Sequence, residues 1–313
     1  MEERFLSGLD ALVAATALLQ RVRLAHPTAG LLEAADLQWW WRSPRSTDAT
    51  PQPFWFDEDG RSVAAVIATD WGNTVALDPI VMPGLAAARV AHVVERGLEH
   101  ARASGLDDVE VVIDAADHDM RALLEGHGFG VTRGEHLAVV DAWLAGEARP
   151  RVGVLPSGYR RLDRRDLHSR PHHLAERNGP AVEARLRQTS LYRADLDLVV
   201  LDDRDDVAAY GLFWFDPATA VGLVEPMRTE TEHQGRGVAR HLLAAGVERL
   251  VAAGVRSVKV CFRPSDAAAR ALYLGAGFEI GKEALVLARD RFARAHGDGA
   301  DPEPSTHRTG RRS

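Results

Sequence analysis

The chain has 313 residues, 46% of them hydrophobic, which is enough for two medium-sized domains with packed cores. Its net charge of -7 argues against a surface built for nucleic acid or for an anionic membrane, so we expect neither partner. Cys261 is the only cysteine, which excludes an internal disulfide and a cysteine-rich metal site and is typical of a reducing compartment.

The N-terminus shows no sign of a targeting segment. It begins Met1-Glu2-Glu3-Arg4, and the apolar positions that follow are periodic and are interrupted by polar and charged residues. This pattern is typical of neither a signal peptide nor a membrane span. We therefore expect a cytoplasmic protein.

Three consecutive tryptophans occupy positions 39–41, and Arg42 and Arg45 follow directly. Their side chains could stack on a ligand or a partner. They could equally end a helix, with two rings in the core and one at a domain interface.

Two segments recur at a constant offset of 149 residues. Residues 121–129 and 270–278 share six of nine positions, and at the same offset residues 105–111 and 254–260 both resemble a turn that leads into a strand. A repeat over such a distance indicates two copies of one structural unit.

Each copy shows the same order of predicted elements. An alternating strand ends in an acidic residue and a proline, Asp78-Pro79 in the first copy and Glu225-Pro226 in the second. An amphipathic helix, another strand and a short helix that ends in Gly-Phe follow. This alternation predicts an α/β unit in each half.

The segment from Leu144 to Pro156 contains the proline and glycine residues that are typical of a linker. We therefore place one domain at residues 1–148 and a second at 149–296. Residues 297–313 contain no hydrophobic residue beyond Ala300, so we expect a disordered tail.

The second copy contains a glycine-rich turn between a strand at 221–229 and a helix that begins near Val238. The turn reads Gln234-Gly235-Arg236-Gly237. Glycines at a helix N-terminus expose backbone N–H groups, which suit a pyrophosphate, but they are also common as simple helix caps. The turn alone therefore leaves both interpretations open.

Two motifs together resemble the GNAT family of N-acetyltransferases. The first is Gln/Arg-x-x-Gly-x-Gly/Ala, present here as Gln234, Gly237 and Ala239. The second is Asn-x-x-Ala-x-x-Leu-Tyr followed by Gly-Phe, matched by Asp266, Ala269, Leu272, Tyr273, Gly277 and Phe278, with aspartate in place of asparagine. The resemblance covers roughly residues 159–289. It implies two tandem GNAT-like domains, each a mixed twisted sheet flanked by helices, in an arrangement similar to that of mycothiol synthase.

The resemblance also implies that acetyl-CoA, as co-substrate, lies between two splayed parallel strands. Backbone groups of Met227, Arg228 and Thr229 would bind its pantetheine arm. The residues that would hold its pyrophosphate or line its site are Gln234, Gly235, Arg236, Gly237, Val238, Ala239 and Arg240. Arg236 and Arg240 could instead belong to a solvated helix face, and the carboxylate of Asp266 puts its inherited contact in question.

Two residues are candidates for the chemistry of acetyl transfer. An alkyl amine must lose a proton before it attacks, and the resemblance places Glu225 as the general base. Tyr273 would protonate the leaving thiolate, and the backbone N–H of Met227 would meet the oxyanion. Purely structural roles for Glu225, as a strand-end carboxylate, and for Tyr273, as a packed aromatic residue, remain the alternatives.

The first copy lacks these features. At the same offset, residues 85–88 (Leu-Ala-Ala-Ala) replace the glycine-rich turn, and Leu124 replaces Tyr273. We expect this copy to be degenerate and to shape the substrate cleft, although Gly84 leaves room for weak cofactor binding.

The predicted function is transfer of an acetyl group to a primary amine of a small molecule or peptide. A mycothiol synthase-like enzyme and a non-catalytic acyl-CoA-binding module are the alternatives. His172, His173 and residues 177–179 could line the acceptor pocket, or the histidines could lie on the surface. No spacing of His, Asp and Glu indicates a metal site.

Overall fold

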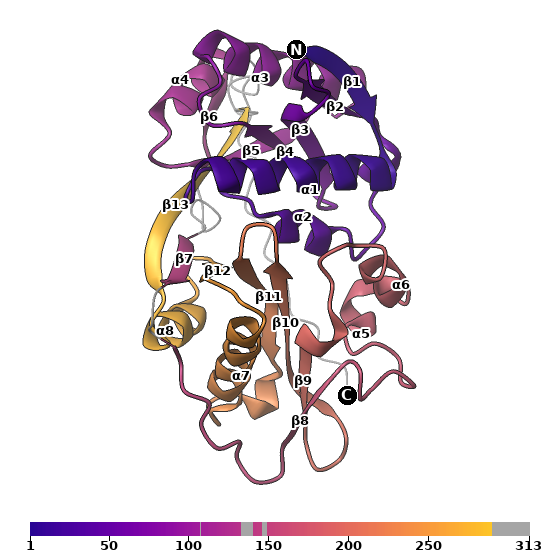
Figure 1. Ribbon diagram of the computed structural model, residues 1–313, viewed down its shortest axis with the longest axis vertical. Coiled ribbons are helices and arrows are strands. Elements are labelled where there is room, and N and C mark those ends of the chain that lie inside the picture. The colour runs from indigo at the N-terminus through magenta and orange to yellow at the C-terminus, as the bar shows by residue number, and fades with distance from the viewer. Residues whose placement is uncertain (107, 133–139, 146–148, 290–313) are drawn as a thin grey trace, which may run out of the picture.

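The computed structural model describes residues 1–106, 108–132, 140–145 and 149–289 (Figure 1). The predicted disordered tail lies outside these ranges. The first half contains β1 (Glu2–Leu6), α1 (Gly8–Ala25), α2 (Ala34–Trp40), η1 (Ser46–Ala49), β2 (Gln52–Phe56), β3 (Ser62–Asp70), β4 (Val75–Val81), α3 (Ala87–Ala103), β5 (Val109–Asp114), α4 (His118–Gly126), β6 (Phe129–Val131) and β7 (Val140–Ala145). The second contains β8 (Arg160–Asp163), α5 (Ala175–Asn178), α6 (Val182–Leu186), η2 (Ala194–Leu196), β9 (Asp197–Leu201), β10 (Val207–Asp216), β11 (Val221–Thr229), η3 (Thr231–His233), α7 (Val238–Ala252), β12 (Ser257–Phe262), α8 (Ala267–Gly275) and β13 (Glu279–Arg289).

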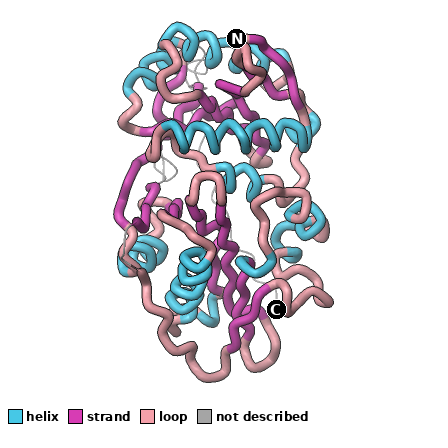
Figure 2. The backbone as a smooth tube through the Cα atoms, viewed as in Figure 1, coloured by secondary structure: helices cyan, strands magenta, loops and turns pink. Residues whose placement is uncertain are grey.

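The two halves have the same order of strands and helices, as the repeat predicts. Each contains a mixed sheet, in which β4 pairs with β5 and β11 pairs with β12 in parallel and the other neighbours are antiparallel. In the described part of the chain, the strands join in the order β1-β2-β3-β4-β5-β13-β7-β12-β11-β10-β9-β8, with β6 beside β13. Figure 2 shows the strands of the second half side by side, with α7 packed against them.

The halves exchange their last strands. β7 belongs to the first half in sequence, but it pairs with β12 along 140–145 and with the first part of β13. The second part of β13 pairs with β5 and β6 of the first half. Figure 1 shows β13 passing from the second half into the first. Each sheet is therefore completed by a strand from the other half.

The predicted linker begins too early, because Leu144 lies in β7 and is fully buried. A central strand can be covered on both faces of its sheet, which buries its hydrophobic residues, and the proline and glycine residues that suggested a linker lie further along the chain. The domain limits of 1–148 and 149–296 remain a prediction, and the exchanged strands link the two units in space.

One glycine in α3 and one in α7 allow these helices to pack closely on their sheets. A Cβ added to Gly246 of α7 would lie 2.0 Å from the Phe213 ring on β10, and one added to Gly97 of α3 would lie 2.6 Å from Val66 on β3. The two glycines are separated by the repeat offset. Both helices thus approach their sheets at a distance that only glycine permits.

The halves meet through α1 and α2, which pack against each other: α1 lies on β3 and β4 of the first sheet, and α2 contacts β10 and β11 of the second. One continuous apolar cluster includes Leu18, Trp39, Leu186, Trp214 and Leu223. Trp39 is buried, whereas Trp41 is partly buried and donates its indole N–H to Gln188 of the second half at 2.8 Å. The tryptophan run therefore ends α2 at the boundary between the halves.

Candidate active site

The parallel strands β11 and β12 separate soon after they begin. Their pairing covers only 221–223 with 257–259. β10 pairs with the other edge of β11 as far as Thr229, with a register shift next to the cis peptide bond between Glu225 and Pro226. Residues 224–229 therefore present a backbone edge that is not paired with β12.

A loop of residues 230–237 connects the end of β11 to α7. Gly235 and Gly237 have φ values of +71° and +81°, in the left-handed region that favours glycine. Neither has an atom within 4 Å of an added Cβ, so the space beside the turn is open. The N–H groups at the start of α7 face a region where a bulky anion has room.

The corresponding connection in the first half is three residues shorter. It covers 82–86, between β4 and α3, against 230–237 in the second half. A single glycine, Gly84, has a positive φ there. The first half therefore lacks the extended glycine turn that the second half has between β11 and α7.

The predicted pantetheine-binding residues lie along the open edge of β11. Met227 packs against the core below α7, while Arg228 is exposed and forms an ion pair with Glu230 at 3.1 Å. The hydroxyl oxygen of Thr229 is buried and has no hydrogen-bond partner in the described part of the chain. An unpartnered buried hydroxyl is unusual, and it offers a hydrogen-bonding group to a ligand at this edge.

The residues of the predicted pyrophosphate loop have different environments. Gln234 donates its side-chain amide to the Thr229 carbonyl at 3.2 Å, which joins the loop to the strand. Arg236 donates to the Tyr159 hydroxyl at 3.3 Å, and Arg240 is exposed on α7. Val238 is buried under the loop and Ala239 is partly buried. Both arginines are therefore accessible to an anion at the helix N-terminus.

Asp266 is the N-cap of α8, and its carboxylate accepts the Ala269 N–H at 2.9 Å. Asp117 caps α4 of the first half in the same way, through the Met120 N–H at 2.9 Å. Because the aspartate occurs in both copies with the same role, helix capping accounts for it without a cofactor.

Glu225 lies at the centre of the open strand and is partly buried. Its backbone carbonyl accepts the Trp214 indole N–H at 2.7 Å, which fixes the strand at this point. Burial, followed by the charge of Asp36, raises the pKa of Glu225 to about 8, although Lys259 and Arg42 act in the opposite direction. Its carboxyl group is hydrogen-bonded to that of Asp36. Glu225 is therefore largely protonated at neutral pH.

Asp36 belongs to α2 of the first half and is buried. It accepts the Glu33 N–H at 2.6 Å and lies 3.3 Å from the ammonium group of the fully buried Lys259. Asp78 of β4 is also buried, and burial together with the charge of Asp36 raises its pKa to about 7. The acid-proline positions of both copies thus lie near one aspartate.

Sequence analysis does not identify Asp36 or Lys259. The only local signal is the Glu-x-x-Asp spacing from Glu33, which indicates a capping box. Both acid-proline pairs lie inside their strands instead of at the ends, because β4 and β11 continue for two and three residues beyond the proline. Glu225 is therefore not a strand-end carboxylate.

Tyr273 is buried on α8, with its ring 5.8 Å from each of the rings of Phe262 and Phe278. Burial and then the charge of Glu225 raise the pKa of Tyr273 above its usual range. The phenol is therefore a neutral donor at physiological pH. The carboxyl group of Glu225 therefore lies close enough to Tyr273 for its charge to act on the phenol.

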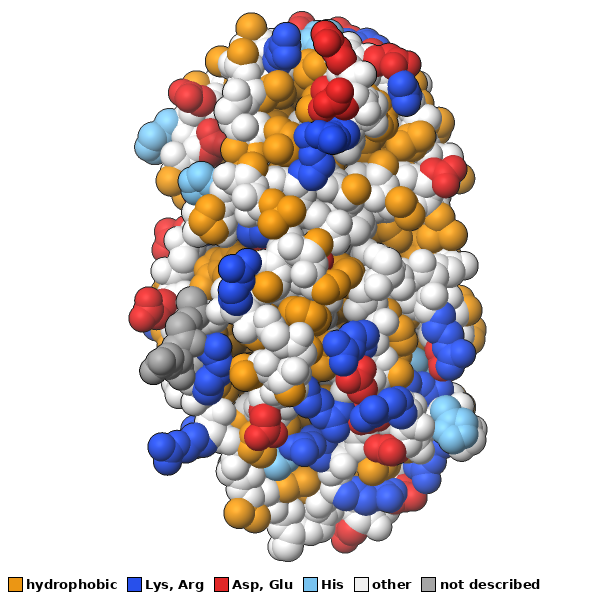
Figure 3. Space-filling view, in the orientation of Figure 1, with side chains coloured by type: hydrophobic (Ala, Val, Ile, Leu, Met, Phe, Trp, Pro, Cys, Tyr) orange, Lys and Arg blue, Asp and Glu red, His pale blue; other side chains and the backbone are white. Residues whose placement is uncertain are grey.

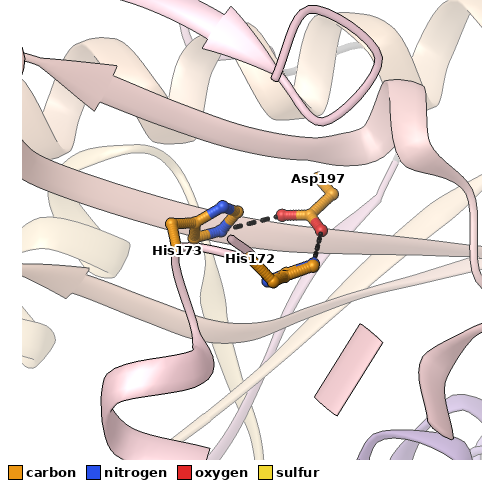
Figure 4. A group of neighbouring side chains, drawn as sticks. All are labelled: His172, His173 and Asp197. Carbon is orange, nitrogen blue, oxygen red and sulfur yellow. Dashed lines mark ion pairs between the residues drawn. The ribbon is translucent and has the colours of Figure 1, made fainter. Parts of the chain in front are cut away.

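His172 and His173 lie beside Asp197, at the start of β9 (Figure 4). Their Nε2 atoms are 2.9 Å and 3.0 Å from the two carboxylate oxygens, and the Tyr192 hydroxyl donates to the same carboxylate at 2.9 Å. Burial alone would raise the pKa of Asp197, but the histidines outweigh it and hold that pKa well below its usual range. The alternative of surface histidines is wrong, because both side chains are at most 3% exposed.

This cluster has the close donor atoms of a cation site, but the hydrogen bonds of one ring oppose metal binding. The Nδ1 atom of His172 accepts the Leu174 N–H at 3.2 Å, so a neutral ring carries its proton on Nε2, towards Asp197. That nitrogen then has no lone pair for a metal. Asp197 and His172 thus belong to a buried hydrogen-bonded network with Tyr192, whereas the ring nitrogens of His173, which packs 5.5 Å from the Tyr210 ring, are buried without a hydrogen-bond partner in the described part of the chain.

Comparisons with known proteins agree with this geometry. Residues 162–278 match the family model described as the acetyltransferase (GNAT) family. This part of the chain therefore matches a GNAT domain, and the whole chain has the tandem GNAT fold.

Three solved structures illustrate the likeness. A tandem GNAT protein from the clavulanic acid biosynthesis pathway has 18% identity and a TM-score of 0.67, over 92% of this chain and 97% of that chain. A GCN5-related N-acetyltransferase from Sphaerobacter thermophilus has 18% identity and a TM-score of 0.59, over 92% and 94%. A GNAT-family acetyltransferase from Colwellia psychrerythraea has 11% identity and a TM-score of 0.56, over 93% and 100%. At these identities the likeness shows the fold alone.

No curated protein sequence matches the chain. None of the helices in the described part of the chain combines the length and the apolar character needed to cross a membrane.

Proposed function

We propose that the protein is an acetyl-CoA-dependent N-acetyltransferase that acts on a primary amine of a small molecule or peptide, with its active site in the second half. The observation that carries this proposal is the open edge of β11 at 224–229, together with the glycine turn at the start of α7. A pantetheine arm can pair with such an edge while the turn holds the pyrophosphate. A cytoplasmic location stays a prediction.

Glu225 and Tyr273 would divide the proton transfers between them. The carboxylate of Glu225 accepts a proton from the amine, directly or through water, so that the nitrogen lone pair can attack the thioester carbonyl. The backbone N–H of Met227 stabilises the negative charge that develops on the carbonyl oxygen. The neutral phenol of Tyr273 then donates a proton to the departing thiolate.

The first half would contribute to the second site instead of forming its own. Its connection between β4 and α3 is too short for the anion-binding turn, while Asp36 reaches Glu225 across the boundary. This arrangement supports one acetyl-CoA site per chain.

Calorimetric titration with acetyl-CoA tests the proposal directly. We expect one site per chain and loss of binding in Gly237→Glu, because this side chain would bring a strained φ and a negative charge into the pyrophosphate position. Gly84→Glu is the matched control and should bind acetyl-CoA normally. Two sites would show that the first half is functional, and intact binding in Gly237→Glu would remove the turn from the cofactor site.

A non-catalytic acyl-CoA-binding module is the second candidate, and the protonated state of Glu225 at neutral pH favours it. Release of free thiol from acetyl-CoA with a broad panel of amines at pH 9 separates the two candidates. Tight acetyl-CoA binding without thiol release at that pH would support the module. A mycothiol synthase-like activity remains an alternative, and none of the contacts described above favours its acceptor over other amines.

A further inference from the structure

Arg42 follows α2 of the first half and lies at the boundary with the second. Its Nε atom donates to the Asn178 side-chain oxygen at 2.6 Å, and one terminal nitrogen donates to the Trp39 carbonyl at 3.2 Å. The guanidinium carbon lies 4.0 Å from the centre of the Trp39 ring. The position of Arg42 is therefore fixed by both halves of the chain.

Asn178 is itself held in place. Its side-chain N–H donates to the Leu174 carbonyl at 3.0 Å, and its backbone carbonyl accepts the Ser43 hydroxyl at 3.0 Å. A guanidinium anchored in this way loses little rotamer entropy when it binds a ligand.

The charge of Arg42 has no carboxylate within ion-pair distance in the described part of the chain, although the side chain is partly buried. Burial, followed by the like charge of Arg45, lowers the pKa of Arg42 to about 10. Burial of a cation is unfavourable unless a counter-charge or several hydrogen bonds compensate for it. Its second terminal nitrogen is available for such a contact.

The acidic groups near Arg42 are Glu225, which is largely protonated at neutral pH, and Glu230, which is shared by two other arginines. Arg177 and Arg228 share the carboxylate of Glu230, at 2.9 Å and 3.1 Å. All three guanidiniums act on the pKa of Tyr210, so they lie around one phenol. Three positive charges therefore surround Tyr210 with a single acidic partner among them.

Arginines elsewhere in the second half are better matched with acidic side chains. Figure 3 shows blue and red side chains intermixed over the second half. Many arginines there have an acidic partner within 3.1 Å, including Arg160, Arg165, Arg170, Arg187 and Arg193. Arg42 lies near Glu225 instead, and each group affects the pKa of the other.

We propose that Arg42 binds a carboxylate of the acyl acceptor, so that the acceptor class is amines that also carry a carboxylate, such as amino acids. The proposal rests on the proposed transferase function, with the amine beside Glu225 and the carboxylate beside Arg42. A guanidinium and a carboxylate form two parallel hydrogen bonds, whereas a neutral amine offers no group for this position. The single unpaired guanidinium favours the singly charged carboxylate over a phosphate.

Binding of matched amines in the presence of CoA, which permits no turnover, tests this assignment. The pairs are 4-aminobutyrate with butylamine, lysine with cadaverine, and tyrosine with tyramine, followed by saturation-transfer NMR. We expect the carboxylated member of at least one pair to bind about 10- to 100-fold more tightly. Arg42→Gln should abolish that difference and leave acetyl-CoA affinity unchanged.

Arg185→Gln is the matched control. Arg185 also lies over a tryptophan, 3.6 Å from the centre of the Trp41 ring, but its charge is paired with Asp48 at 2.5 Å. This variant should keep the preference for the carboxylated amines, and thermal melts of both variants verify folding.

Equal binding within every pair, absence of binding, or a preference that survives in Arg42→Gln would overturn the assignment. Tighter binding of phosphoethanolamine than of every carboxylated amine would also overturn it, in favour of a phosphate. Failure of the transferase function has a different signature, because acetyl-CoA binding or thiol release would then be absent while the carboxylate preference persists.

Discussion

At the scale of single residues, the site depends on acidic groups that come from both halves. Asp36 lies 3.3 Å from the ammonium group of Lys259 and accepts the Glu33 N–H at 2.6 Å, so its carboxylate is held in place. Its charge then acts on Glu225 and on Asp78, and the pKa values of both are raised. The first half thereby sets the protonation state of the candidate base in the second.

The activity should rise with pH through about 8. Glu225 accepts a proton only when it is ionised, and its pKa is raised to about 8, so kcat/KM should increase up to that value and then level off. Asp36→Asn removes a neighbouring negative charge and should move the rise to lower pH. The measurement is a profile of kcat/KM between pH 6 and pH 10.

Two variants make the pH profile interpretable. Asp78→Asn is the control, because Asp78 is not among the groups that shift the pKa of Glu225, and its profile should match that of the unmodified protein. Glu225→Gln should lower kcat/KM by about 100-fold or more. A rise that stays at pH 8 in Asp36→Asn would show that another group controls the profile.

Asp78 should make the protein less stable as pH rises, whereas an ordinary ion-paired aspartate makes a protein more stable as pH rises. Burial and then the charge of Asp36 raise its pKa from 3.8 to about 7 in the folded protein. The unfolded chain therefore loses its proton first, and stability falls as pH rises from about 4 to about 7. Asp78→Asn should stabilise the protein by about 2–4 kcal/mol at pH 8.5, and the gain should disappear near pH 4.

Urea unfolding at the two pH values measures this difference. Asp59→Asn, at an exposed turn position, is the control and should change stability little at either pH. A gain for Asp78→Asn that is the same at pH 4 and pH 8.5 would show that removal of the charge is not its cause.

At the scale of elements, the sequence predicts what is local and repeated. The glycine turn and the helix that follows it depend on backbone conformation within a few residues, so their motif is visible. The burial of His172 and His173, which lie in a loop, depends on Asp197, which is more than twenty residues away on β9. The alternating pattern of β7 is the same whichever sheet it joins, so the strand exchange was not predictable.

The close approach of α7 to β10 gives a prediction at this scale. In Gly246→Ala the new methyl group would lie 2.0 Å from the Phe213 ring, so either the helix or the ring must move. We expect a loss of about 2–4 kcal/mol of stability, measured by urea unfolding. Phe213→Leu in the same chain should recover part of the loss because it makes room.

Gly126→Ala is the matched control for this helix prediction. Gly126 is also helical, at the end of α4, but has no atom within 4 Å of an added Cβ. The substitution should be neutral or slightly stabilising, since alanine has the higher helix propensity. Equal effects of the two substitutions would mean that helix propensity, and not contact with Phe213, determines the loss.

At the scale of the whole molecule, the exchanged strands make the halves interdependent. The second sheet contains β7 from the first half between β12 and β13, and the first sheet contains the end of β13 between β5 and β6. Either half on its own would have an unpaired edge and lack a central strand of its sheet. We therefore expect the proposed acetyl-CoA site to require the first half, even though the motifs of that site lie in the second.

A protease site inserted after Val154, which is 97% exposed, tests this dependence. After cleavage, the two fragments should remain associated and bind acetyl-CoA as the intact chain does, because every strand is still present. Residues 155–313 expressed alone should fail to bind acetyl-CoA, whereas co-expression with residues 1–154 should restore binding. Both results can be measured by gel filtration and calorimetry. Full affinity in the isolated second fragment would show that the missing β7 strand is dispensable, and that the exchange is a feature of assembly with no part in forming the site.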